Sequence, residues 1–202
     1  YLNKDHNFRH KLLTASSRGL IYDQFGQWAS GGAPLAHTCW HSFEPMFGPS
    51  NVFVVPLNSF LQTLSTDSYL WACSVGSGQY ISLNNVGSTA DFASYNPKSI
   101  FNSLFGSWSG DWDYNNNVLR APLATSYGLA SVWAGFPPWY LHHMALGETI
   151  GYSTVQTQNN GAGGSKTGFS GTGSGGIIYY KNSQPDEAYY PCTADKPQCY
   201  EP

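Results

Sequence analysis

The chain has 202 residues, a formal net charge of −3 and 41% hydrophobic residues. This apolar content predicts one packed domain and argues against disorder, which combines low hydrophobicity with high net charge. The negative charge excludes a basic protein that binds nucleic acid by neutralising phosphates. No apolar run approaches the ~20 residues that a membrane-spanning helix needs, so we expect no membrane span.

Low charge and an even number of cysteines predict export. Charged residues make up only 10% of the chain, against roughly 25% in typical globular proteins. The four cysteines allow three pairings, of which we expect Cys192 with Cys199 and Cys39 with Cys73. Four free thiols are the alternative. Because disulfides persist in oxidising compartments, we expect an extracellular or cell-surface protein, with neither a cofactor nor a structural zinc ion.

The N-terminal part of the chain predicts one helix and one strand. Residues 1–13 have the pattern of a short amphipathic helix, and residues 20–25 that of a short strand. Residues 26–34 are rich in Gly, Ala and Ser, which indicates a turn. Residues 35–43 form a short apolar segment that contains two histidines.

The middle of the chain predicts a strand, a helix and a strand in succession. VFVV at 52–55 is typical of a buried strand, and Pro56 suits the first turn of a helix that continues to residue 64. YLWACSV at 69–75 is a second buried strand, and two parallel strands need such a crossover connection. A long loop of Gly, Ser and Asn follows at 76–92.

The pattern then repeats. Residues 97–108 predict a helix start and an apolar strand, and 118–125 predict a helix. Residues 129–135 predict a strand, and 137–158 a longer helix with proline in its first turn. Strands that alternate with helices in this way predict an α/β fold with a parallel sheet.

Composition divides the chain into three parts. Residues 1–160 hold the alternating pattern and form the α/β domain. Residues 161–176 are dominated by glycine and predict a flexible linker. Residues 177–202 are rich in Tyr and Pro and predict an extended C-terminal arm, in which Cys192 and Cys199 would close a short loop.

Several residues in the predicted loops suit acyl transfer. Loops at the carboxyl ends of parallel strands are where α/β proteins place their sites. The candidates are Ser107 or Cys73 as nucleophile, His142 or His143 as base, and Asp111 as the partner of the base. Structural roles are the alternative: a small turn residue for the serine, and packing for the histidines. On successive helical positions the two rings point about 100° apart, so only one of them can face a site.

The same loops suggest two kinds of binding site. Asp111 and Asp113 carry the oxygen ligands that Ca²⁺ prefers, although Gly-Asp-x-Asp more often caps a helix and closes a turn. Trp108, Trp112 and Trp139 lie in or beside loops, where exposed aromatic faces would stack on sugar rings. Burial in the core is the more common role of such aromatic residues.

Four stretches of the chain resemble a known family. They are YLNKDHNFRHKL, YLWACSVGSGQY with VGSTADFAS, LFGSWSGDWDYNNNVLRAPLA, and LASVWAGFPPWYLHHMALGETIGYSTVQTQNN. These stretches are similar to uncharacterised exported bacterial proteins related to the gingipain-type cysteine peptidases. The resemblance covers about residues 1–160 and implies a partial domain of caspase-like fold.

The catalytic residues of that family are not kept. In those peptidases the catalytic histidine ends one strand and the nucleophilic cysteine ends the next, before Gly-Asp. The resemblance places the histidine position at 75–77, which is Val-Gly-Ser, and the cysteine position near Ser107. A serine that lacks its histidine is a very poor nucleophile. The resemblance therefore implies the fold and not peptidase activity.

The resemblance also implies an open sheet. Relatives carry further strands before the segment at 1–13 and another strand after residue 160, so we expect an unpaired edge, which proteins normally cover. We predict a non-catalytic extracellular structural or assembly protein, completed by self-association or by a partner chain. An exported hydrolase that uses Ser107 or Cys73, and a glycan-binding module, are the alternative functions.

Overall fold

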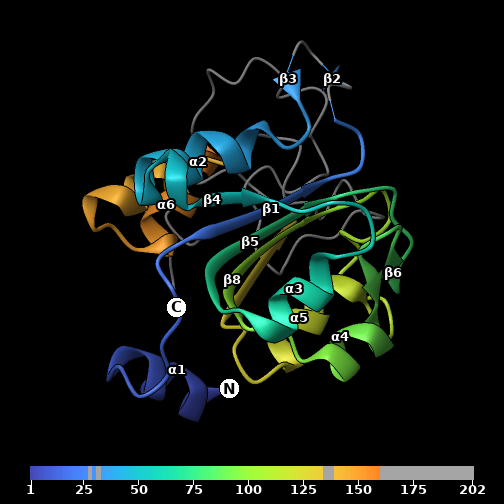
Figure 1. Ribbon diagram of the computed structural model, residues 1–202, viewed down its shortest axis with the longest axis horizontal. Helices are drawn as coiled ribbons and strands as arrows, with labels where there is room; N and C mark the ends of the chain where they lie inside the picture. Colours follow the sequence, from blue (N-terminus) through green and yellow to red (C-terminus); the bar gives the residue numbers. More distant parts are fainter. Residues whose placement is uncertain (27–28, 31–32, 134–138, 160–202) are drawn as a thin grey trace.

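The computed structural model describes residues 1–26, 29–30, 33–133 and 139–159 (Figure 1). These ranges fall within the predicted α/β domain. The predicted linker at 161–176, the arm at 177–202 and the expected Cys192–Cys199 bridge lie outside the described residues.

A five-stranded sheet forms the centre of the domain. In spatial order its strands are β4 (Val52–Val54), β1 (Gly19–Asp23), β5 (Tyr69–Val75), β8 (Ser99–Phe105) and β9 (Ala130–Trp133). Every neighbouring pair is parallel. From β1 the chain first adds β4 on one side of the sheet, and it then crosses over to add β5, β8 and β9 on the other side. The point where the strand order reverses therefore lies between β1 and β5, as in doubly wound folds. The predicted α/β fold with a parallel sheet is thus confirmed.

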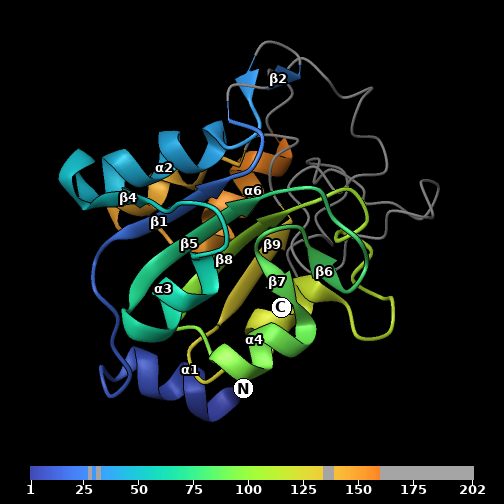
Figure 2. The ribbon, with the colours of Figure 1, turned by 45° about the vertical axis from the view of Figure 1, so that its right-hand side comes forward.

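Helices cover both faces of the sheet (Figure 1, Figure 2). One face carries α2 (His37–Phe47), the 3-10 helix η3 (Leu141–Leu146) and α6 (Ile150–Asn159). The other face carries α3 (Phe60–Thr66), α4 (Thr89–Tyr95), η2 (Val118–Arg120) and α5 (Ala121–Ala124). The remaining short elements are β2 (Ala29–Ser30), β3 (Ala33–Pro34), η1 (Pro49–Asn51), β6 (Ser82–Leu83) and β7 (Gly87–Ser88).

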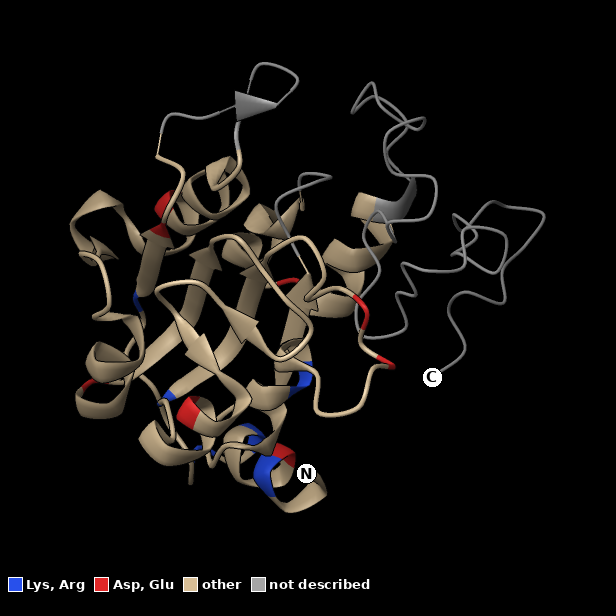
Figure 3. Ribbon diagram, turned by 90° about the vertical axis from the view of Figure 1, so that its right-hand side faces the viewer, with Lys and Arg blue, Asp and Glu red and all other residues tan. Residues whose placement is uncertain are grey.

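The N-terminal helix α1 (Leu2–Arg9) is tied to the end of α5. Lys4 Nζ donates hydrogen bonds to the backbone oxygens of Leu123 at 2.9 Å and Thr125 at 2.7 Å. Lysine near the last carbonyls of a helix is a favourable arrangement. Figure 3 shows few charged residues along the ribbon, with lysines and arginines mainly at the end of the sheet where α1 lies.

Alternation along the strands divides the core into two layers, because successive side chains point to opposite faces. The layer under α2 and η3 includes the buried aromatic residues Phe43, Trp71 and Trp139 and the two bonded cysteines. The layer under α3, α4 and η2 combines aliphatic side chains, several of them leucines, with five buried aromatic residues: Tyr22, Phe60, Tyr69, Phe92 and Trp133. Both faces of the sheet are therefore buried, as a parallel sheet requires.

The predicted disulfide between Cys39 and Cys73 is present. It joins α2 to β5, and the two residues are 1% and 0% exposed. The same helix lies close to β1: a β-carbon built on Gly19 would be 2.5 Å from the Phe43 ring. Glycine at the start of β1 thus lets α2 pack directly on the backbone of the sheet.

The segment at 52–55 is a strand, but the expectation that it is buried was wrong. β4 is an edge strand. The exposed fractions are 39% for Phe53, 57% for Val54 and 60% for Leu57 just beyond the strand. A run of four apolar residues cannot indicate how many neighbours a strand has, because central and edge strands share that pattern. We refer to Phe53, Val54 and Leu57 as the β4 edge.

Two helices were not predicted. The segment at 35–43, expected only as an apolar stretch, belongs mostly to α2, which continues through Pro45. The loop expected at 76–92 contains the start of α4, which is capped by Ser88 and Asp91: the serine hydroxyl accepts the Asp91 N–H, and the carboxylate accepts the Ser88 N–H. Ser-x-x-Asp is a variant of the capping box, so the sequence did contain a signal for α4.

The double variant Cys39→Ala/Cys73→Ala should lose roughly 2–4 kcal/mol of unfolding free energy. The bridge joins residues 34 positions apart, and without it the unfolded chain gains entropy. Urea unfolding of the oxidised protein, followed by tryptophan fluorescence, measures the difference. Equal midpoints for wild type and variant would show that the bridge does not stabilise the fold.

Candidate functional site

Gln24 joins the carboxyl ends of β1 and β5. Its backbone N–H donates to Val75 O at 2.8 Å. Its side-chain Oε1 accepts the Ser77 N–H at 2.8 Å and the Ser77 hydroxyl at 3.3 Å. The crevice between these two strands is where α/β proteins of this topology usually bind ligands. Here a glutamine lies against Ser77, in the segment where the peptidase resemblance would place a histidine.

The loops that follow β5 and β8 touch through their backbones. A β-carbon built on Gly106 would lie 2.7 Å from Gly78 Cα, and one built on Gly78 would lie 2.7 Å from Gly106 Cα. At these distances neither position accepts a larger residue without moving the other loop. Close packing of the two loops therefore favours glycine at position 106, immediately before Ser107.

The structure does not bring the expected nucleophiles and bases together. Ser107 is exposed and, in the part of the chain that the structure describes, makes no hydrogen bond to a histidine. His143 Nδ1 instead lies 2.9 Å from Tyr140 O. Cys73 is buried in the disulfide, and a nucleophilic cysteine needs a free thiolate. The role of Cys73 as nucleophile is therefore wrong for the oxidised protein.

The rings of His142 and His143 stack, with centroids 4.3 Å apart and an interplanar angle of 29°. The expectation that they point about 100° apart was wrong, because rotation about the side-chain bonds brings the rings together although their Cα–Cβ bonds diverge. The single helix expected at 137–158 is also divided: η3 ends at Gly147, where φ is +90°, and α6 follows.

The two aspartates of the Gly-Asp-Trp-Asp sequence lie in different environments. Asp111 is buried and Asp113 is exposed. Asn117 Nδ2 donates to the backbone oxygens of Ser109 at 3.1 Å and Asp111 at 2.9 Å, so hydrogen bonds close this segment into a turn. Among the described residues, no group of three or more His, Cys, Asp or Glu side chains is arranged to hold a metal ion.

One of the three tryptophans considered for sugar binding is well exposed. The exposed fractions are 47% for Trp108 and 2% for Trp139, whereas Trp112 packs partly buried against the core. The Trp108 ring lies 5.7 Å from that of Tyr80, which stacks on Tyr114 at 4.2 Å between centroids. We call Tyr80, Trp108 and Tyr114 the aromatic ladder.

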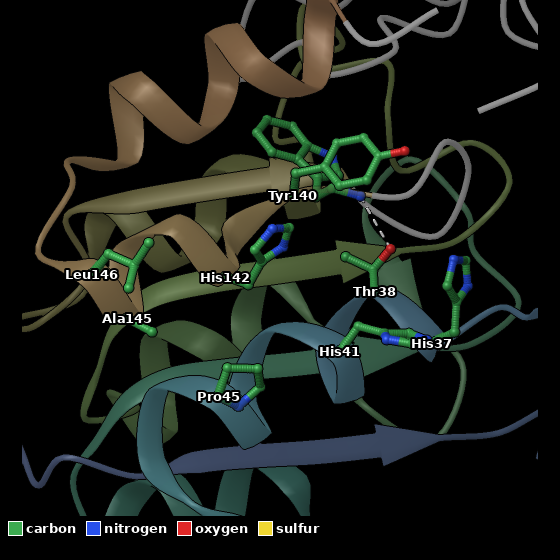
Figure 4. Close-up of a pocket in the computed structure, with 9 residues that line it drawn as sticks. His37, Thr38, His41, Pro45, Tyr140, His142, Ala145 and Leu146 are labelled. Carbon is green, nitrogen blue, oxygen red and sulfur yellow. Dashed lines mark hydrogen bonds between the residues drawn. The ribbon is translucent and has the colours of Figure 1, made fainter. Parts of the chain in front are cut away.

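A cavity of about 690 Å³ lies between α2 and η3 (Figure 4). Its walls carry His37 and His41 from α2 and His142 from η3, together with Trp139 and Leu146. In the sequence, His37 and His41 belong to the apolar segment at 35–43, and no motif assigns them a role. The sequence signal for this pair is the spacing of four residues. This spacing places both side chains on one face only if the segment is a helix.

The surroundings of His142 favour the neutral form of its imidazole. Burial lowers its pKa below the ordinary value of 6.5, and the neighbouring His143 and His41 lower it further. A neutral ring accepts a hydrogen bond or binds a metal ion through its free nitrogen. The wall formed by η3 is thus uncharged near neutral pH.

No known protein family matches this chain, and neither a curated protein nor a solved structure matches it significantly. The resemblance to the gingipain-type peptidases therefore stays a prediction. In the ranges that the structure describes, no helix has the length and apolar character needed to cross a membrane.

His142 should titrate below 6.5 in the folded protein. Because its folded pKa lies below the unfolded one, the unfolded chain binds more protons, and stability falls as the pH decreases from about 6.5 through the folded pKa. NMR titration of the histidine Cε1 protons measures the pKa, with His142→Gln to assign the resonance. A midpoint at or above 6.5 would contradict the expected burial.

Proposed function

We propose that the protein is a non-catalytic extracellular structural or assembly protein, built on a degenerate peptidase-like domain and completed by a second copy of the chain. The observation that carries this proposal is the β4 edge, where Phe53, Val54 and Leu57 are exposed by 39%, 57% and 60%. An exposed apolar edge strand pairs readily with another chain.

The two edges of the sheet differ in a way that supports pairing at β4. On β9, Val132 and Trp133 are only 0% and 6% exposed. On the opposite side, the Val55 N–H donates to Ile21 O at 3.0 Å. Since alternate residues of a parallel strand bond to opposite sides, the backbone groups of Val54 point away from β1. β4 thus offers both apolar side chains and backbone hydrogen bonds to an added strand.

The non-catalytic part of the proposal rests on the two expected nucleophiles. Cys73 is oxidised to a disulfide with Cys39, and Ser107 has no histidine bonded to it within the described residues. The same disulfide favours an extracellular location, because reducing compartments keep thiols reduced.

The chain contains a sequence suited to strand addition. IIYY at 177–180 combines β-branched and aromatic residues, the types that strands prefer. The glycine-rich sequence at 161–176 lies between this segment and the domain. We propose that this segment of one copy pairs with β4 of another by strand addition.

The variant Val54→Lys should be monomeric under conditions where the wild-type chain is a dimer or larger, because lysine on an edge strand opposes pairing. Ile178→Pro should have the same effect, since proline removes a backbone donor from the added strand. Light scattering of each full-length chain at equal concentration measures the mass.

Leu146→Lys is the matched control, because Leu146 is 83% exposed and lies outside the β4 edge. It should keep the wild-type mass. A monomeric wild-type chain would refute assembly through β4. Labelling of Ser107 by a serine-directed phosphonate would instead overturn the non-catalytic assignment and favour the hydrolase.

Glycan binding is a second candidate function, supported by the aromatic ladder. Trp108 and Tyr114 each expose 47% of their surface, and both rings pack on Tyr80 between them. The ladder comes from the loops after β5 and β8, at the edge where α/β proteins place their sites. Exposed aromatic faces held rigidly in this way suit stacking on sugar rings.

If the ladder binds glycans, Trp108→Ala should reduce retention on an insoluble polysaccharide such as cellulose or chitin. We expect affinity roughly 2- to 10-fold lower, the equivalent of one aromatic stacking contact. Tyr95→Ala is the control, since Tyr95 is 45% exposed on α4 and outside the ladder. Equal retention of the wild type and Trp108→Ala would exclude this site.

A further inference from the structure

We infer that the cavity between α2 and η3 holds a site for a divalent late transition metal ion such as Cu²⁺ or Zn²⁺, with His37 and His41 as its protein ligands. The inference does not depend on assembly through β4 or on glycan binding. It rests on the spacing of the two histidines, the cavity that they line and the way in which α2 is anchored.

The two histidines lie close enough together to share one ion. They are four residues apart on α2, so their side chains share one face of the helix. Their ring centroids lie 5.9 Å apart with an interplanar angle of 82°. Two imidazoles that each bind one ion at ~2.1 Å have centroids roughly 5–6 Å apart. Histidines at this helical spacing bind zinc in metalloproteases.

The cavity leaves room for the rest of the coordination shell. Its volume is about 690 Å³, and the lining residues that the structure describes include no lysine or arginine to repel a cation. His142 lies on the opposite wall, as Figure 4 shows. Because the described residues contain no cluster of three such ligands, we assign two protein ligands and leave the remaining positions to water or a small ligand.

The backbone between the two ligands is anchored from two sides. Cys39, midway between them, is bonded to Cys73 of the sheet. Thr38 Oγ1 accepts the Trp139 N–H at 3.1 Å. These contacts fix the segment of α2 that carries the ligands, and a ligand pair held by its surroundings binds with less loss of entropy.

The donor set selects the class of ion. Imidazole nitrogen suits Cu²⁺, Zn²⁺ and Ni²⁺, whereas Ca²⁺ and Mg²⁺ require oxygen ligands. None of the described residues that line the cavity carries a carboxylate. Of the divalent ions, Cu²⁺ binds most tightly to a given nitrogen site, which makes it the best probe.

The test is a Cu²⁺ titration of the oxidised full-length chain, followed by tryptophan quenching, with ligand nitrogens counted by electron paramagnetic resonance. Every protein carries His6→Ala, because His6 and His10 form another pair with centroids 4.2 Å apart. In this background we expect one Cu²⁺ per chain with two nitrogen ligands. Adding His41→Ala should weaken binding by about tenfold or more and remove one nitrogen.

His143→Ala is the matched control: its ring stacks on His142 but is not part of the cavity wall, so its affinity should equal that of the background. Circular dichroism checks that His41→Ala folds, which we expect because His41 is exposed and alanine favours helices. Absence of Cu²⁺ binding in the background, or unchanged affinity in both His37→Ala and His41→Ala, would overturn the inference.

Discussion

The contact between α2 and the middle of the sheet determines how the rest of the molecule is arranged. Cys39 is bonded to Cys73 in β5, and Phe43 packs on the bare backbone of Gly19 in β1. These contacts hold α2 across the two strands between which the chain reverses direction. The same helix forms one wall of the cavity and carries its two histidines. The position of the cavity wall formed by α2 therefore depends on this contact.

Covering both faces of a parallel sheet does not close its edges. The crossover helices bury the side chains of the central strands, and β9 is also buried although it lies at one end. β4 has a neighbour on one side only, and Val54 on it is 57% exposed. A strand of three residues offers few backbone hydrogen bonds, so the apolar side chains must supply much of the energy of any pairing there. Assembly at β4 would therefore depend on burying the side chains of the β4 edge.

Local patterns predicted the sheet well and the site poorly. The strands β1, β5, β8 and β9 lie close to their expected ranges, because apolar runs bounded by turn residues are a local signal. α2 escaped prediction because Pro45 and its histidines obscure a helical pattern, and α4 because it begins inside a loop of small residues. Whether Ser107 meets a histidine depends on how distant segments pack, which spacing along the chain does not encode. The pairing of Cys39 with Cys73 was predicted from cysteine number and compartment rather than from geometry.

The carboxyl edge of the sheet is closely packed. Here the loops after β5 and β8 touch at Gly78 and Gly106, and the Gln24 side chain bonds Ser77 across the adjoining crevice. The exposed aromatic surface lies further out, on the ladder that includes Trp108. The exposed rings of the ladder thus stand on closely packed loops, an arrangement that agrees with the proposed glycan binding.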